Sequence, residues 1–464
     1  MVGEAGLRPN VLLLMTDQQR WDSLGCVGGW VDTPNLDRIA SRGVRFSHCV
    51  TTSPICVPAR VSLATGHYPH NFGVWGHVDY TLDPTTPTWM QAVRDAGYRT
   101  SVFGKTHLHA HVGDLREKEH LLHAYGLDDV DEIAGPRLSA TVMSHMTARW
   151  AELGLLDAYR ADVEDRMTTK PWVVRPSPLP LEEYADVYVG RRAREYLAGC
   201  QRDEPWFCWV SFGGPHEPWD TPEPWASHHD PEAMPPPLPP LKRGDPWPDG
   251  SLDRWLAWLG QPFTPEEIQR MRADYAGNVS LIDDQIGGIL RTIEERGELN
   301  RTVIVFTSDH GEMNGDHGLM YKMNFFDGSV RVPLIVSTPA VASSPAAGTT
   351  DATPVEWIDV GPTIVEAVGA ELSHHQFGTS LLPALEGQRV REDALSEFEG
   401  EFMLLTDDWK LALNDRGEPY LLFDRHADPD EAENLVLDGA TSSVRTDLRL
   451  RMLDRLVTAQ VQHR

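Results

Sequence analysis

Cysteine is scarce in this chain, and the few cysteines are not arranged in pairs. Among 464 residues there are five, an odd number scattered without a Cys-x-x-Cys pair. Small secreted domains are held together by dense, regularly spaced cysteines, so this usage excludes a disulfide framework and favours a reducing compartment. Four of the five receive no function from the sequence: Cys26, Cys49, Cys200 and Cys208.

Long apolar runs and an excess of positive charge are also missing. The first apolar run, VLLLM, is too short for a signal-peptide core or a membrane span, so we expect a soluble, cytoplasmic protein without a membrane partner. The 41 basic residues are outnumbered by 69 acidic ones, and the formal net charge of -28 excludes a general affinity for nucleic acid. An anionic ligand would therefore need a local cluster of cations.

The chain has the length and the pattern of a large α/β protein. With 41% hydrophobic residues it can bury a sizeable core. Apolar strand-like runs alternate with stretches of helical period, which predicts a mostly parallel sheet flanked by helices on both faces. The strands are predicted at 10–16, 100–104, 206–212, 302–309 and 332–339, and the helices at 33–43, 86–98, 183–200 and 264–299.

The pattern changes along the chain and predicts a division into two parts. Short strands with a turn at residues 414–417 predict a small C-terminal α+β subdomain with an antiparallel sheet at 386–464, after a main domain at 1–385. Weak periodicity at 112–183 and a proline-rich stretch at 231–250 predict two insertions in the main domain.

Polar side chains follow four of the predicted strands. Asp17 and Gln18 follow the first strand, and the segments KTHLH (105–109), GGPHEP (213–218) and SDHGE (308–312) follow three others. Singly, such residues are usually caps or solvated loop side chains. Ligands of open parallel sheets bind beyond the carboxyl ends of the strands, and divalent cations take several oxygen ligands. Together, these segments therefore predict a metal site at one sheet edge.

Cys56 lies in the stretch SPICVPARVSLATG, residues 53–66. Pro58 suits the first turn of a helix that ends at Gly66, so Cys56 is predicted at a helix N-terminus, where anionic oxygen is stabilised. A low-pKa redox thiol and a buried packing cysteine are the alternatives for Cys56.

These motifs resemble those of the type I, formylglycine-dependent sulfatases of the alkaline phosphatase superfamily. Cys56, Pro58 and Arg60 form the family signature C-x-P-x-R, and SLATG follows it. The resemblance extends through NVLLLMTDQ, TPNLDRIASRGVRF, GKTHL, GPHEP and TSDHGEMNGDHGLMYK to the closing DPDEAENL, and so covers nearly the whole chain. It implies an alkaline-phosphatase-like fold, a large mixed and mostly parallel sheet.

The resemblance also implies a cofactor and a partner. In this family a separate maturation enzyme oxidises the cysteine, here Cys56, to formylglycine, whose aldehyde hydrates to a geminal diol. One divalent cation, calcium by the family's habit with manganese or magnesium as alternatives, is implied to bind an oxygen of the modified Cys56 together with Asp17, Gln18, Asp309 and His310. Gln18 and His310 replace a frequent Asp and Asn, as in the choline sulfatase and phosphonate monoester hydrolase branches.

Catalytic roles follow from the resemblance residue by residue. Asp309 is implied to take a proton from the diol, which attacks sulfur to give a sulfated diol. His107 is implied to deprotonate the second hydroxyl so that sulfate leaves, and His216, with Lys322, to protonate the leaving alcohol. The implied contacts of the sulfate oxygens are Arg60, Lys105 and Lys322.

The resulting hypothesis is hydrolysis of a small-molecule sulfate ester. Lys105 and His107 favour sulfate over the alternative, a phosphonate monoester or phosphodiester. A noncatalytic or unmatured relative, and a cysteine-nucleophile hydrolase with His107 or His216 as base, stay open. Trp75 and His77 are predicted to shape the leaving-group pocket, while aryl, sugar, steroid and alkyl esters remain alternatives. Nothing in the sequence indicates an oligomeric state.

Overall fold

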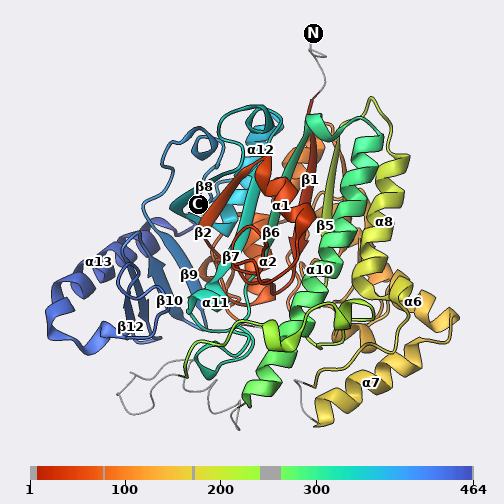
Figure 1. Ribbon diagram of the computed structural model, residues 1–464. Coiled ribbons are helices and arrows are strands. Elements are labelled where there is room, and N and C mark those ends of the chain that lie inside the picture. Colours follow the sequence, from red (N-terminus) through yellow and green to blue (C-terminus); the bar gives the residue numbers. More distant parts are fainter. Residues whose placement is uncertain (1–7, 77–78, 170–172, 241–262, 462–464) are drawn as a thin grey trace.

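A computed structural model describes residues 8–76, 79–169, 173–240 and 263–461 of the protein (Figure 1). Within these residues the main sheet has eight strands. The strands are β1 (Asn10–Thr16), β2 (Val44–Val50), β3 (Arg99–Gly104), β4 (Asp129–Glu132), β5 (Trp206–Ser211), β6 (Thr302–Ser308), β7 (Arg331–Ser337) and β8 (Thr349–Glu356). Their order is β4-β3-β5-β1-β6-β7-β2-β8. Only β7 runs antiparallel to its neighbours, so the predicted mixed, mostly parallel sheet is confirmed.

Helices cover both faces of this sheet (Figure 1). They are α1 (Pro34–Ser41), α2 (Cys56–Thr65), α3 (Pro69–Phe72), α4 (Trp89–Asp95), α5 (Glu119–Ala124), α6 (His145–Glu152), α7 (Leu156–Thr169), α8 (Ala185–Gly199), α10 (Pro265–Glu295), α11 (Asp327–Val330) and α12 (Val360–Ala367). Alternate residues of β1 enter opposite cores because strand side chains alternate in direction: Leu13 packs with α2, α4 and α12, and Leu12 with α1, α8 and α10. The continuous apolar run of β1 follows from this burial on both faces.

The local signals in the sequence set the helix ends. Thr264 and Glu267 form the capping box that begins α10, and the left-handed Gly66 ends α2, which begins at Cys56 as predicted. Region 112–183 holds the edge strand β4 and helices α5, α6 and α7. Of region 231–250, residues 241–250 lie outside the described residues.

A second, antiparallel sheet follows in the order β12-β11-β10-β9, as predicted (Figure 1). Its strands are β9 (Ala394–Phe398), β10 (Glu401–Leu405), β11 (Trp409–Leu413) and β12 (Pro419–Asp424), and α13 (Ser442–Thr458) packs Leu448 and Met452 against it. The turn at 414–417 is present, with the Gly417 N–H donating to the Asn414 carbonyl at 2.9 Å. The division after residue 385 stays a prediction. None of the helices in the described ranges is both long and apolar enough to cross a membrane.

Candidate active site

The carboxyl ends of four neighbouring parallel strands build the site. The strands β3, β5, β1 and β6 lie side by side, so the residues that follow them meet at one edge of the sheet. Asp17 follows β1, Lys105 follows β3, and Asp309 follows β6. The backbone N–H of Asp17 donates to the Gly214 carbonyl at 3.0 Å, which ties β1 to the loop after β5.

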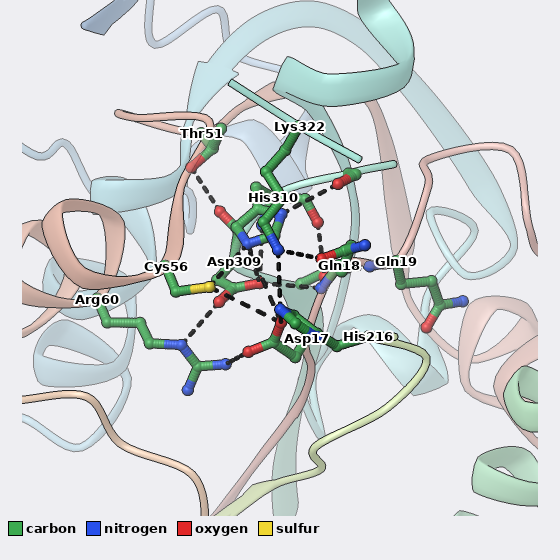
Figure 2. A network of polar contacts seen from close by, with 12 residues as sticks. Asp17, Gln18, Gln19, Thr51, Cys56, Arg60, His216, Asp309, His310 and Lys322 are labelled. Atoms are coloured by element: carbon green, nitrogen blue, oxygen red, sulfur yellow. Dashed lines mark hydrogen bonds and ion pairs between the residues drawn. The ribbon is translucent and has the colours of Figure 1, made fainter. Parts of the chain in front are cut away.

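Four of the predicted ligands form one buried cluster (Figure 2). One donor atom from each of Asp17, Cys56, Asp309 and His310 lies within 4.8 Å of the others. His310 Nδ1 lies 3.0 Å from the Gly311 carbonyl oxygen, so Nδ1 carries the proton and Nε2 keeps its lone pair toward Cys56 Sγ, 3.1 Å away. Burial lowers the pKa of His310, which keeps the ring neutral and available to a metal.

Arg60 binds the two carboxylates of this cluster. Its Nε donates to Asp309 Oδ2 at 2.7 Å and its Nη2 to Asp17 Oδ2 at 2.9 Å, while Nη1 donates to the Lys105 carbonyl at 2.6 Å. With a further bond from Nη1 to Ser211 Oγ at 3.1 Å, four of its five N–H donors are engaged by protein atoms, and its side chain does not line the cavity described below. These bonds position the two carboxylates, and the expected contact of Arg60 with the sulfate oxygens stays a prediction.

Gln18 is held by two buried glutamates that the sequence interpretation missed. Its Nε2 donates to Glu217 Oε2 at 3.0 Å and also to Glu312. Its Oε1 accepts from Lys322 Nζ (Figure 2). Burial raises the pKa of Glu312 to about 7. Burial acts the same way on Glu217, but His216, Lys322 and Arg137 outweigh it and hold its pKa at about 2. The amide of Gln18 therefore separates two carboxyl groups.

A carboxylate at position 18 is expected to destabilise the fold. Gln18→Glu would place a third acid between Glu217 and Glu312, with one oxygen on Lys322 Nζ and the other facing the two carboxyl groups in place of a donor. We expect the free energy of unfolding to fall by about 2–4 kcal/mol, since the loss of a buried donor and the added buried like charge are both costly. Urea denaturation measures this loss. Adding Glu312→Gln to the same chain should restore at least half of it, and unchanged stability of Gln18→Glu would contradict the assignment.

The positive side chains of the site line its open side. Lys105 Nζ lies 2.5 Å from Asp17 Oδ2 and 3.8 Å from Cys56 Sγ, and Lys322 Nζ lies 2.8 Å from His216 Nε2. His216 Nδ1 lies 2.7 Å from the Glu217 carbonyl oxygen, so Nδ1 donates and Nε2 accepts from the Lys322 ammonium.

These charges control the acidity of the metal-facing carboxylate. Burial by itself raises the pKa of Asp17, but Lys105, His216 and Arg60 hold it well below its usual range. Burial by itself lowers the pKa of Lys322, but its acidic neighbours, of which Glu217 has the largest effect, raise the pKa above its usual value. The local cluster of cations expected for an anionic ligand is therefore present inside an acidic protein.

A cavity of about 560 Å³ opens over Cys56. Its lining residues are Ile55, Cys56, Lys105, His107, Ala134, Gly135, Pro136, Arg137, Leu138, His216, Glu217, Tyr321, Lys322, Met323, Phe398 and Glu399. Of its charged groups, Lys105 and Lys322 interact with Cys56, and Ile55, Ala134, Pro136, Leu138, Met323 and Phe398 give the lining its apolar surface. Trp75 is not in the lining, although its carbonyl accepts from the Glu399 N–H at 3.3 Å, and His77 lies outside the described residues.

The site thus unites the predicted residues with several unforeseen ones. Glu217 directly follows His216 and Glu312 comes two residues after His310, so a search of the motif neighbours could have found both. Phe398 and Glu399 had no such signal, because the β9–β10 turn brings them from the second sheet.

The donor set fits a divalent metal ion. Two carboxylates and a neutral imidazole nitrogen converge on Cys56, and His310 has the hydrogen-bonded Nδ1 typical of metal-binding histidines. The fifth predicted ligand, the amide oxygen of Gln18, accepts from Lys322 Nζ instead.

Comparisons with known proteins agree with this chemistry. Residues 9–370 match the Sulfatase family, and residues 315–458 match the family described as N-sulphoglucosamine sulphohydrolase, C-terminal. A choline-sulfatase of Rhizobium meliloti (strain 1021) is 30% identical over 95% of this chain and 86% of its own length. An arylsulfatase of Clostridium perfringens is 27% identical over 93% and 90%. The phosphonate monoester hydrolase structure of Agrobacterium radiobacter has a TM-score of 0.80 and 26% identity, covering 97% of this chain and 96% of that one.

Fold and site together define a hydrolase of the alkaline phosphatase superfamily. The resemblance drawn from the motifs is thereby confirmed. The chain belongs to the sulfatase family and is a sulfuric ester hydrolase, of a family that implies a divalent metal and a formylglycine.

Proposed function

We propose that this sulfatase hydrolyses a small-molecule sulfate ester with residue 56, after conversion of Cys56 to formylglycine by a separate maturation enzyme, as the nucleophile. One observation carries the proposal. Cys56 is the first residue of α2, and its side chain lies beside the donor atoms of Asp17, Asp309 and His310 and lines the cavity. Formylglycine supplies a geminal diol oxygen as nucleophile, which an unmodified side chain does not.

The metal is assigned to Asp17, Gln18, Asp309, His310 and an oxygen of the modified residue 56. When bound, a divalent cation supplies Lewis-acid polarisation and charge neutralisation at the transferred group. We propose calcium by family habit, with manganese as the second candidate because His310 offers a nitrogen donor. Arg60 holds Asp17 and Asp309 in place for this set.

The proton-transferring residues surround the same position. Asp309 would accept the proton of the attacking hydroxyl of the modified residue 56, because its carboxylate is buried against Cys56 and oriented by Arg60. His107, in the cavity wall, would accept the proton of the second hydroxyl, so that sulfate can leave. Lys322 shares a proton with His216 at 2.8 Å, and this pair donates to the leaving alcohol. Lys105 and Lys322 stabilise negative charge on the sulfate oxygens.

The leaving group is assigned to the apolar part of the cavity. Leu138, Met323 and Phe398 offer apolar surface there, and Arg137 and Glu399 add one charge of each sign to the lining. A small ester fits a cavity of about 560 Å³. The similarity to a phosphonate monoester hydrolase keeps phosphonate monoesters and phosphodiesters as the second candidate substrates.

Mass spectrometry and paired kinetics test the proposal. The protein is coexpressed with a formylglycine-generating enzyme, and the peptide carrying Cys56 is expected to be about 18 Da lighter, as oxidation of a thiol to an aldehyde requires. The same sample is then assayed with an aryl sulfate and an aryl phosphonate monoester, and a higher kcat/KM is expected for the sulfate. Full activity with only the unmodified thiol would refute the nucleophile, and preference for the phosphonate would reverse the substrate order.

A further inference from the structure

A second buried cluster lies behind the wall of the active-site cavity. Glu132, the last residue of β4, accepts from His109 Nε2 at 2.7 Å and from His111 Nε2 at 3.0 Å. Thr106 Oγ1 donates to the same carboxylate. A carboxylate only accepts, so both imidazoles present an N–H at Nε2. All the partners of Glu132 in this cluster come from the loop that follows β3.

The residues that Glu132 binds lie on both sides of His107 in the sequence. Thr106 precedes His107, and His109 and His111 follow it, while Lys105 and His107 turn toward the cavity over Cys56. The rings of His107 and His111 are in contact, with their centroids 4.3 Å apart and their planes tilted by 55°. Glu132 therefore reaches His107 through one intervening imidazole as well as through the loop backbone.

The backbone of this loop needs such support. His107 has a φ of 55°, in the left-handed region that non-glycine residues adopt only where the surrounding structure enforces it. Strand pairing places Glu132 opposite Gly104, and the Ile133 N–H donates to the Gly104 carbonyl at 3.2 Å. The carboxylate is thus fixed at the point where the loop leaves β3.

We propose that Glu132 is a positioning residue for sulfate ester hydrolysis, which holds His107 against the cavity by binding Thr106, His109 and His111. The inference rests on the proposed role of His107 as a proton acceptor. Glu132 does not line the cavity, so in this role it acts through the histidine that it supports.

A double-mutant cycle tests this inference in the full-length, matured enzyme. Glu132→Gln keeps the size of the side chain but removes one acceptor oxygen. We expect kcat to fall roughly 10- to 100-fold, because small displacements of a catalytic group are costly, with KM changed less than about threefold. In a His107→Ala background the same substitution should lower kcat by less than about threefold, since the group it positions is gone.

Asp131→Asn is the matched control. Asp131 is the neighbouring buried carboxylate of β4, and it pairs with Tyr188 and Arg192 away from the loop. It should keep kcat within about threefold of wild type, because it supports no catalytic group. Thermal melting of each variant establishes that it is folded, and if Glu132→Gln does not fold, His111→Asn takes its place in the cycle.

The outcomes separate the two proposals. An equal loss from Glu132→Gln with and without His107 would overturn the positioning role alone. Wild-type kcat in His107→Ala would overturn the proposed role of His107 and this inference with it. The three side chains could also hold a metal ion. Loss of one metal ion per chain in Glu132→Gln, measured by elemental analysis, would therefore overturn the inference in favour of a metal site.

Discussion

Cys56→Ala is expected to abolish turnover of sulfate esters. Removing the nucleophile of a covalent mechanism leaves only binding and electrostatic stabilisation, so we expect kcat to fall by at least roughly 10⁴-fold. Alanine preserves the start of α2, and a buried thiol contributes little packing volume, so the fold should persist. Steady-state kinetics with an aryl sulfate, on protein coexpressed with the maturation enzyme, measures the loss.

Cys49→Ala separates this effect from the general loss of a buried thiol. Cys49 lies in β2 and is as buried as Cys56, but it faces the apolar core. Its substitution should cost about 1 kcal/mol in unfolding free energy and leave kcat unchanged. Turnover by Cys56→Ala within tenfold of wild type would show that residue 56 is not the nucleophile.

Much of this site could be predicted because its ligands follow strands. Asp17 and Asp309 come directly after buried apolar runs, and parallel strands carry their ends to one edge. The helix start at Cys56 has its own local signals in Pro58 and Gly66. Where periodicity and turn chemistry decide the structure, the prediction and the structure agree.

The carboxylates that support the site carry no such local signal. Glu132 lies in a region whose weak periodicity suggested an insertion, yet β4 there completes the edge of the main sheet. Glu312 and Glu217 meet on Gln18 although they are far apart in the chain. Such contacts depend on the tertiary structure, and so does the use of Arg60, whose two carboxylate partners follow different strands.

Asp17→Asn is expected to weaken metal binding and to destabilise the metal-free protein. Asp17 Oδ2 accepts from Arg60 at 2.9 Å and lies 2.5 Å from Lys105 Nζ, and both partners are buried. Asparagine would leave these two cations facing an uncharged amide. Its NH₂ group is itself a hydrogen-bond donor and cannot accept from either cation. Because one partner of a buried pair is removed, we expect a loss of about 3–5 kcal/mol in unfolding free energy. Urea denaturation in the presence of EDTA measures it.

Asp186→Asn is the control for a buried carboxylate near the same sheet edge. Asp186 Oδ1 accepts from the backbone N–H groups of Gly213 and Gly214, at 2.8 and 3.0 Å, and an asparagine oxygen can keep both bonds. Burial raises the pKa of Asp186 to about 6, so at neutral pH the group is mostly ionised and its buried charge costs free energy. Loss of that charge offsets the weaker hydrogen bonds to an amide oxygen, and we expect a change below about 1 kcal/mol.

The metal gives a second measurement on the same two variants. Loss of a ligand carboxylate should raise the Kd for the activating cation at least roughly 100-fold in Asp17→Asn, since even outer-sphere partners of a metal affect affinity 10- to 100-fold. Asp186→Asn should bind as the wild type does, in a calorimetric titration of the chelator-treated protein. An unchanged Kd for the cation in Asp17→Asn would remove Asp17 from the ligand set. An unchanged unfolding free energy would show that burial of Lys105 and Arg60 does not depend on the charge of Asp17.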